Sequence, residues 1–146
     1  MAIGEAELLE LLNSAPTHDG VVVETLDDER MRALRDDLKR VIRGEGEPGI
    51  LDSYLTGVSW KPSIGKTGVD WGLQGPAEAI PYAELVLEWD RVRTELPGRL
   101  RPCENDECTK FLIDHSKPNT ARWCSMAECG NRMKARRHYA RQTAKQ

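Results

Sequence analysis

The sequence has 146 residues, and its 21 lysines and arginines against 24 aspartates and glutamates give a formal net charge of −3. No apolar run approaches the roughly 20 residues of a membrane-spanning helix, so we do not expect an integral membrane protein or a membrane partner. The first residues are acidic and carry no basic segment of the kind that opens a secretory signal, so we expect a cytoplasmic protein.

Residues 1–98 have the pattern of a small, mainly helical domain. A leucine-rich amphipathic stretch at residues 8–12 is followed by a short β-branched run, Val21–Val23, which we expect to be extended. The clearest helix spans about residues 26–43, because its apolar side chains recur at intervals of three and four residues. A linker that contains glycine and proline then leads to a short helix over about 50–56.

A β-hairpin is predicted next, with strands over Ser59–Ile64 and Val69–Leu73 and with Trp60 and Trp71 as candidate packing residues. The turn contains Gly65-Lys66-Thr67, which invites comparison with a phosphate-binding P-loop. That motif needs another glycine five residues before Gly65, where this sequence has Trp60, so we reject nucleotide binding.

The N-terminal part is predicted to end at residue 98, where a second long helix stops and the charge changes sign. This helix begins near Ala77 or Pro81, and its apolar face, which we assign to the core, comprises Tyr82, Leu85, Val86, Trp89 and Val92. Residues 1–98 hold 10 basic and 19 acidic residues, whereas residues 99–146 hold 11 and 5, so the net charges are −9 and +6. Such asymmetry indicates a basic module that meets an anionic partner, with a solvated helix that has no partner as an equal alternative.

All four cysteines lie within 27 residues, in two C-x4-C pairs with fifteen residues between them: Cys103, Cys108, Cys124 and Cys129. Two such pairs are the usual signature of a tetrahedral Zn(Cys)4 site, although a two-residue gap within each pair is more common. Residues 99–146 contain too few apolar side chains to fold unaided, and one structural Zn2+ per chain would supply the missing stability. Disulfides and an iron–sulfur cluster are the weaker alternatives.

The second cysteine pair surrounds the start of a predicted helix. Ser125–Glu128 fits a capping box, which predicts a helix from about Met126 to Gln142 with a cysteine on each side of its first turn. A short strand is expected over Phe111–Asp114, between the cysteine pairs. Together these parts describe a treble-clef-like or ribbon-like finger that ends in a long helix.

Gly130 is a poor helix former and lies within the first turns of this helix. We interpret it as a position that lets the Cys103–Cys108 knuckle approach closely. On this hypothesis Asn131 or Arg132 hydrogen-bonds the backbone or the thiolates of that knuckle, with an outward-pointing Arg132 as the alternative.

The predicted terminal helix is strongly basic. At about 100° per residue, one row of basic side chains falls within an arc of roughly 80° and comprises Lys134, Arg137, Arg141 and Lys145. An arginine row on a rigid helix suits phosphate contacts or insertion into the major groove of DNA. The candidate nucleic-acid-binding residues are Arg132, Lys134, Arg136, Arg137 and Arg141.

Three consecutive motifs, Arg122–Ala127, Cys129–Arg132 and Met133–His138, resemble the CGNR zinc-finger family, which takes its name from the second of them. The resemblance covers residues 101–141 and implies that the four cysteines are metal ligands. An ABATE-type domain usually precedes the finger in this family, and Leu9–Ser14 resembles its opening motif. Members are described as bacterial transcriptional regulators, some linked to stress, and the label RNA-binding zinc-ribbon-like is also used.

We therefore expect a mainly α protein with an ABATE-like acidic helical domain and one hairpin over residues 1–98, and a Zn(Cys)4 finger over residues 99–146. We expect a DNA-binding transcriptional regulator and not an enzyme. Duplex DNA is favoured over RNA because the basic helix offers few aromatic side chains for stacking. RNA binding and a protein–protein interaction module without nucleic acid are the alternatives, and a homodimer and a contact between the acidic domain and the basic finger are further expectations.

Overall fold

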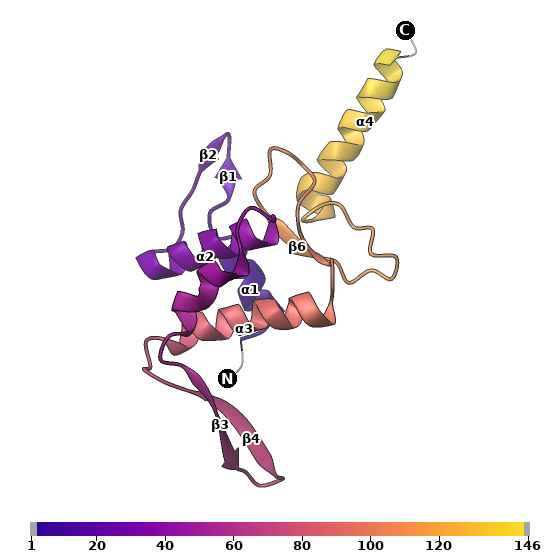
Figure 1. Cartoon of the computed structure of the whole chain (residues 1–146). Helices are drawn as coiled ribbons and strands as arrows, with labels where there is room; N and C mark the ends of the chain where they lie inside the picture. Colours follow the sequence, from indigo (N-terminus) through magenta and orange to yellow (C-terminus); the bar gives the residue numbers. More distant parts are fainter. Residues whose placement is uncertain (1–2, 145–146) are drawn as a thin grey trace.

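The computed structural model describes residues 3–144, which are mainly helical with three small antiparallel hairpins (Figure 1). In chain order the elements are α1 Glu5–Leu12, β1 Thr17–His18, β2 Val21–Val22, α2 Glu29–Ile42, the 3-10 helix η1 Pro48–Leu55, β3 Ser59–Ile64, β4 Val69–Gln74, α3 Ile80–Glu95, β5 Leu100–Pro102, β6 Phe111–Ile113, the π-helical turn η2 Met126–Gly130 and α4 Asn131–Ala144. This order confirms the predicted fold class. None of the helices in the described range is both long and apolar enough to cross a membrane.

Helices α1, α2 and α3 pack together with η1 around one apolar core. The predicted apolar face of α3 lies in or against that core. Helix α2 begins at Glu29, three residues later than expected, because the Asp28 side chain accepts a hydrogen bond from the Met31 backbone N–H at 3.1 Å and caps the helix. Helix α3 begins at Ile80, so Pro81 lies in the first turn, where the absence of its N–H costs nothing.

The first hairpin of the finger is packed into the same core. Strand β5 pairs with β6, and the Phe111 side chain at the start of β6 is only 1% exposed. The Asn13 side chain, just after α1, binds both backbone groups of Phe111. Its Oδ1 accepts from the Phe111 N–H at 2.7 Å, and its Nδ2 donates to the Phe111 carbonyl at 3.2 Å. Helix α1 and the finger are therefore joined by hydrogen bonds and by apolar packing, and the division at residue 98 stays a prediction.

Strands β3 and β4 form the expected hairpin, but its tryptophans are not core residues. Trp60 is 55% exposed and Trp71 is 64% exposed. The prediction that they pack inside the protein is wrong, because the hairpin projects away from the helices (Figure 1). Helices α1–α3 fill their own core without it.

Candidate metal centre and basic helix

Four cysteines from two separate segments meet at the base of α4. Cys103 follows β5 directly, and Cys108 closes the turn after it, where its backbone N–H donates to the Asn105 carbonyl at 2.8 Å. Cys124 precedes η2, and Cys129 lies within that turn. All four Sγ atoms lie within 4.8 Å of one another. The predicted set of ligands is therefore brought together.

The separation of the sulfurs fits tetrahedral zinc. With Zn–S bonds of about 2.3 Å, neighbouring thiolates at the corners of a tetrahedron lie about 3.8 Å apart. The Cys108 and Cys124 sulfurs are 3.8 Å apart, and the Cys124 and Cys129 sulfurs are 3.6 Å apart. Four cysteines fill the coordination shell of the ion and leave no open position for a substrate. The cluster is a site for one structural Zn2+.

Three N–H groups are directed at these sulfurs. The Asn105 side chain donates to Cys129 Sγ at 3.4 Å, the Lys110 backbone to Cys108 Sγ at 3.4 Å, and the Cys124 backbone to Cys103 Sγ at 3.3 Å. Such bonds stabilise thiolates and orient the ligands. Asn105 is 2% exposed, and its Oδ1 also accepts from the Glu107 N–H at 3.2 Å, which shapes the first knuckle. Asn105 was not among the site residues predicted from the sequence, although an asparagine between two paired cysteines is a recognisable turn residue.

Without a metal, the thiols differ in acidity. Burial raises the pKa of Cys108 to about 11 and also raises the pKa of Cys124. For Cys129 burial acts in the same direction, but the hydrogen bonds from Asn105 and the neighbouring thiols outweigh it and lower the pKa. Because the metal binds thiolates, zinc must displace protons from Cys108 and Cys124, and zinc affinity must fall as the pH falls.

The predicted start of the terminal helix is confirmed, with a different first turn. The Ser125 side chain accepts from the Glu128 N–H at 3.0 Å, as in a capping box. The Glu128 carboxylate does not complete the box and instead forms an ion pair with Lys110 at 2.9 Å. The Gly130 N–H donates to the Ser125 carbonyl at 2.9 Å, so the first turn is a π-helix rather than an α-helix. Wide turns of this kind are frequent at functional sites.

The neighbours that crowd Gly130 belong to its own segment. A Cβ added at Gly130 would overlap the Met126 Sδ and would lie 3.2 Å from Cδ1 of Trp123. The interpretation that Gly130 makes room for the Cys103–Cys108 knuckle is therefore wrong. Asn131 and Arg132 are exposed, and within residues 3–144 the side-chain N–H that reaches a cysteine sulfur comes from Asn105.

An aspartate organises the loop between the two cysteine pairs. Asp114 is 2% exposed and accepts hydrogen bonds from the Ser116 and Ala121 backbones, each at 2.8 Å. The Arg101 guanidinium also reaches the Asp114 carboxylate at 2.8 Å. Hydrogen bonds from Ser116, together with those from Ala121 and Arg101, hold the pKa of Asp114 well below its usual range. This loop leads to Cys124, so Asp114 helps to position the second ligand pair.

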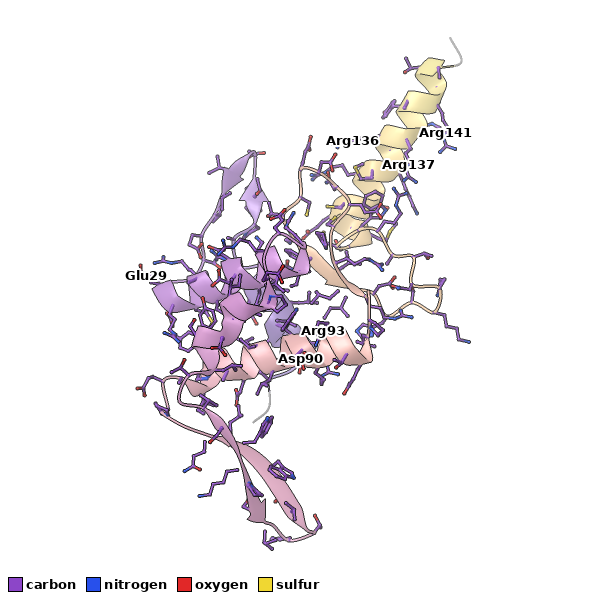
Figure 2. The ribbon with its side chains drawn as sticks, viewed as in Figure 1. Glu29, Asp90, Arg93, Arg136, Arg137 and Arg141 are labelled. Carbon is purple, nitrogen blue, oxygen red and sulfur yellow. The ribbon has the colours of Figure 1, made fainter. Side chains whose placement is uncertain are left out.

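Helix α4 projects from the zinc site and away from the acidic helices (Figure 2). None of its residues is buried. Arg136 pairs with Glu107 at 2.9 Å, and the Arg137 guanidinium lies 5.8 Å from the Trp123 ring centre, so both brace α4 against the finger. The other three candidate nucleic-acid-binding residues form no ion pair with any residue in the range 3–144. They are Arg132, Lys134 and Arg141. Lys145 lies outside the described residues, and a contact between α4 and the acidic part stays a prediction.

Residues 99–142 match the family model described as CGNR zinc finger. The matched segment contains the four-cysteine cluster and nearly all of α4, so this part of the chain is similar to CGNR zinc fingers. No curated protein matches the chain. Because the family match begins at residue 99, the ABATE-like identity of the N-terminal part stays a prediction.

Proposed function

We propose that this protein is a non-enzymatic transcriptional regulator that binds duplex DNA through α4. The observation that carries the proposal is the composition of this exposed helix: it contains five basic residues and no acidic residue, and none of its residues is buried. A helix that buries nothing against its own protein gains little from folding in isolation. Its charge instead matches the phosphate backbone of nucleic acid.

The ion pairs of the finger support this assignment because they leave much of the charge on α4 available. Arg132, Lys134 and Arg141 have no acidic partner within residues 3–144. Lys134 and Arg141 are seven residues apart and therefore lie on the same face, two turns from each other. Phosphates along one strand of a duplex could meet both side chains together.

The zinc site would serve this function by fixing the base of α4. Cys124 precedes η2 and Cys129 lies within it, and the Arg136 and Arg137 contacts continue the support into the second turn of α4. Zn2+ supplies the bonds that hold the two cysteine segments together when it is bound. A helix that is already ordered pays less entropy when it binds than a flexible basic tail does.

The proposal is tested by fluorescence anisotropy of a labelled 20-base-pair duplex with the zinc-loaded chain across a series of salt concentrations. Contact with four to six phosphates predicts a log–log slope of about −3.6 to −5.4. The variant Lys134→Glu/Arg141→Glu should weaken binding and make the slope shallower by about 1.8, since two phosphate contacts are lost. Lys61→Glu/Lys66→Glu is the matched control, because it changes the net charge equally at exposed positions of the β3–β4 hairpin.

Equal losses in the two variants would show that overall charge, and not α4, determines binding. A slope near zero, or no binding to duplex DNA, would contradict the proposal. A parallel titration with single-stranded RNA of equal length separates the nearest alternative, because an RNA-binding finger would prefer that strand at every salt concentration.

A further inference from the structure

The β3–β4 hairpin has one entirely apolar face. The strands pair Trp60 with Leu73, Pro62 with Trp71 and Ile64 with Val69. Side chains of directly paired residues lie on the same face of an antiparallel ribbon, and so do residues two apart on one strand. All six side chains therefore share one face, which we call the ribbon face: Trp60, Pro62, Ile64, Val69, Trp71 and Leu73.

The opposite face of the same hairpin is polar. It carries Ser59, Lys61, Ser63, Asp70, Gly72 and Gln74. A clean alternation of this kind is what a strand shows when one of its faces is covered by another apolar surface. An isolated two-stranded hairpin in water is marginally stable at best. The pattern therefore indicates that the ribbon face has a partner.

No other part of the described chain covers the ribbon face. Ile64 is 83% exposed and Val69 is 56% exposed, in addition to the two exposed tryptophans. The hairpin extends from the helical body at the opposite end from α4 (Figure 1). The finger and the helical core therefore both leave it unpartnered within residues 3–144.

Charge favours an uncharged protein surface as the partner. None of the six residues of the ribbon face is ionisable, so this face offers nothing to phosphates or to ionic headgroups. The surrounding residues 1–98 have a net charge of −9, which repels nucleic acid and anionic lipid surfaces. A partner with an apolar and uncharged surface needs no charged group on the ribbon face and therefore matches these six side chains.

A second copy of the chain provides such a surface, and its area is sufficient. If a fully exposed tryptophan presents about 250 Å², the two tryptophans of one chain expose about 300 Å². Two copies then contribute about 600 Å² from their tryptophans alone. The other residues of the ribbon face raise this value toward the roughly 1,000 Å² of a specific interface.

We infer that the ribbon face is a dimerisation surface on which two copies of this chain pack their hairpins face to face. The contact is isologous, so a twofold axis passes between the two hairpins. Each apolar face is then covered by the same face of the other copy. Because the hairpin and α4 lie at opposite ends of the molecule (Figure 1), this dimer leaves both basic helices exposed. The inference does not depend on DNA binding.

The test is sedimentation velocity of the full zinc-loaded chain from 1 to 100 µM. The wild type should shift from monomer to dimer as its concentration rises. Trp71→Lys should weaken dimerisation at least 100-fold, because each dimer loses two buried tryptophans and gains two charges in the interface. Ser63→Lys is the matched control: it places the same charge on the polar face of the neighbouring strand and should leave the dimer intact.

Ile64→Lys is a second variant at the most exposed position of the ribbon face, so it stays informative if Trp71→Lys folds poorly. Zinc content and thermal midpoints establish that each variant is folded. A wild type that remains monomeric at 100 µM would overturn the inference, even if it bound neutral phosphatidylcholine vesicles through this hairpin. Equal dimerisation of Trp71→Lys, Ile64→Lys and Ser63→Lys would also overturn it.

Discussion

An alanine at position 130 should destabilise the zinc finger, and a second substitution at Met126 should reverse the effect. Alanine normally favours a helix over glycine by about 1 kcal/mol. At Gly130 the new methyl group would overlap the Met126 Sδ and would press on Trp123. Overpacking of this kind costs about 1–3 kcal/mol. Because Met126 is 47% exposed, its side chain can move partly aside, so we expect a net loss of about 0.5–1.5 kcal/mol.

In the Met126→Ala background the main overlap is absent, so Gly130→Ala should become neutral or stabilising. The coupling between the two substitutions should be about 1–2 kcal/mol, within the range for residues in contact. Urea unfolding of the four zinc-loaded proteins measures it. Gly49→Ala is the control, because a Cβ there meets nothing within 4 Å. An equal loss from Gly130→Ala in both backgrounds would refute the steric explanation.

Three further predictions concern side chains that hold the finger together. Asn105→Ala should lower zinc affinity about 10–100-fold in competition with a chromophoric chelator, whereas Asn131→Ala should leave it unchanged. Asn13→Ala should lower the free energy of unfolding in urea by about 1–3 kcal/mol, because the Phe111 N–H and carbonyl lose their partners. Asp114→Asn should lower the thermal midpoint at pH 7. Because the pKa of Asp114 is lower in the folded state, its carboxylate stabilises the fold fully above about pH 4, and the difference from the variant should shrink progressively as the pH falls from there toward the lower pKa of the folded state.

The elements of the fold follow from local patterns, and most of them could be predicted. Apolar periodicity locates α2 and α3, and the spacing of the cysteines identifies the metal site, because both signals lie within short stretches of sequence. The start of α2 was placed near residue 26 because acidic residues at 27–29 suit the first turn of a helix, whereas Asp28 lies before the helix and caps it by accepting from the Met31 N–H. Local patterns therefore identify an element more reliably than its ends.

The failures involve contacts between distant residues or the absence of such contacts. Nothing local to Asn13 indicates that it binds Phe111, 98 residues later in the chain. Trp60 and Trp71 were expected to be packing residues of the hairpin, yet both are more than half exposed in the described chain. For Gly130 the expectation of a close approach was correct and the partner was wrong, since Met126 and Trp123 belong to the same segment. Each miss concerns the identity of a neighbour, which sequence spacing does not specify.

Binding of duplex DNA by a zinc-held basic helix can be measured as a change in DNA affinity when zinc is removed and restored. Anisotropy of the labelled duplex should show binding by the zinc-loaded chain, loss of at least tenfold in affinity after chelation, and recovery when one equivalent of Zn2+ is returned. Elemental analysis of each sample confirms its zinc content. Unchanged duplex affinity in a demonstrably zinc-free protein would contradict the account.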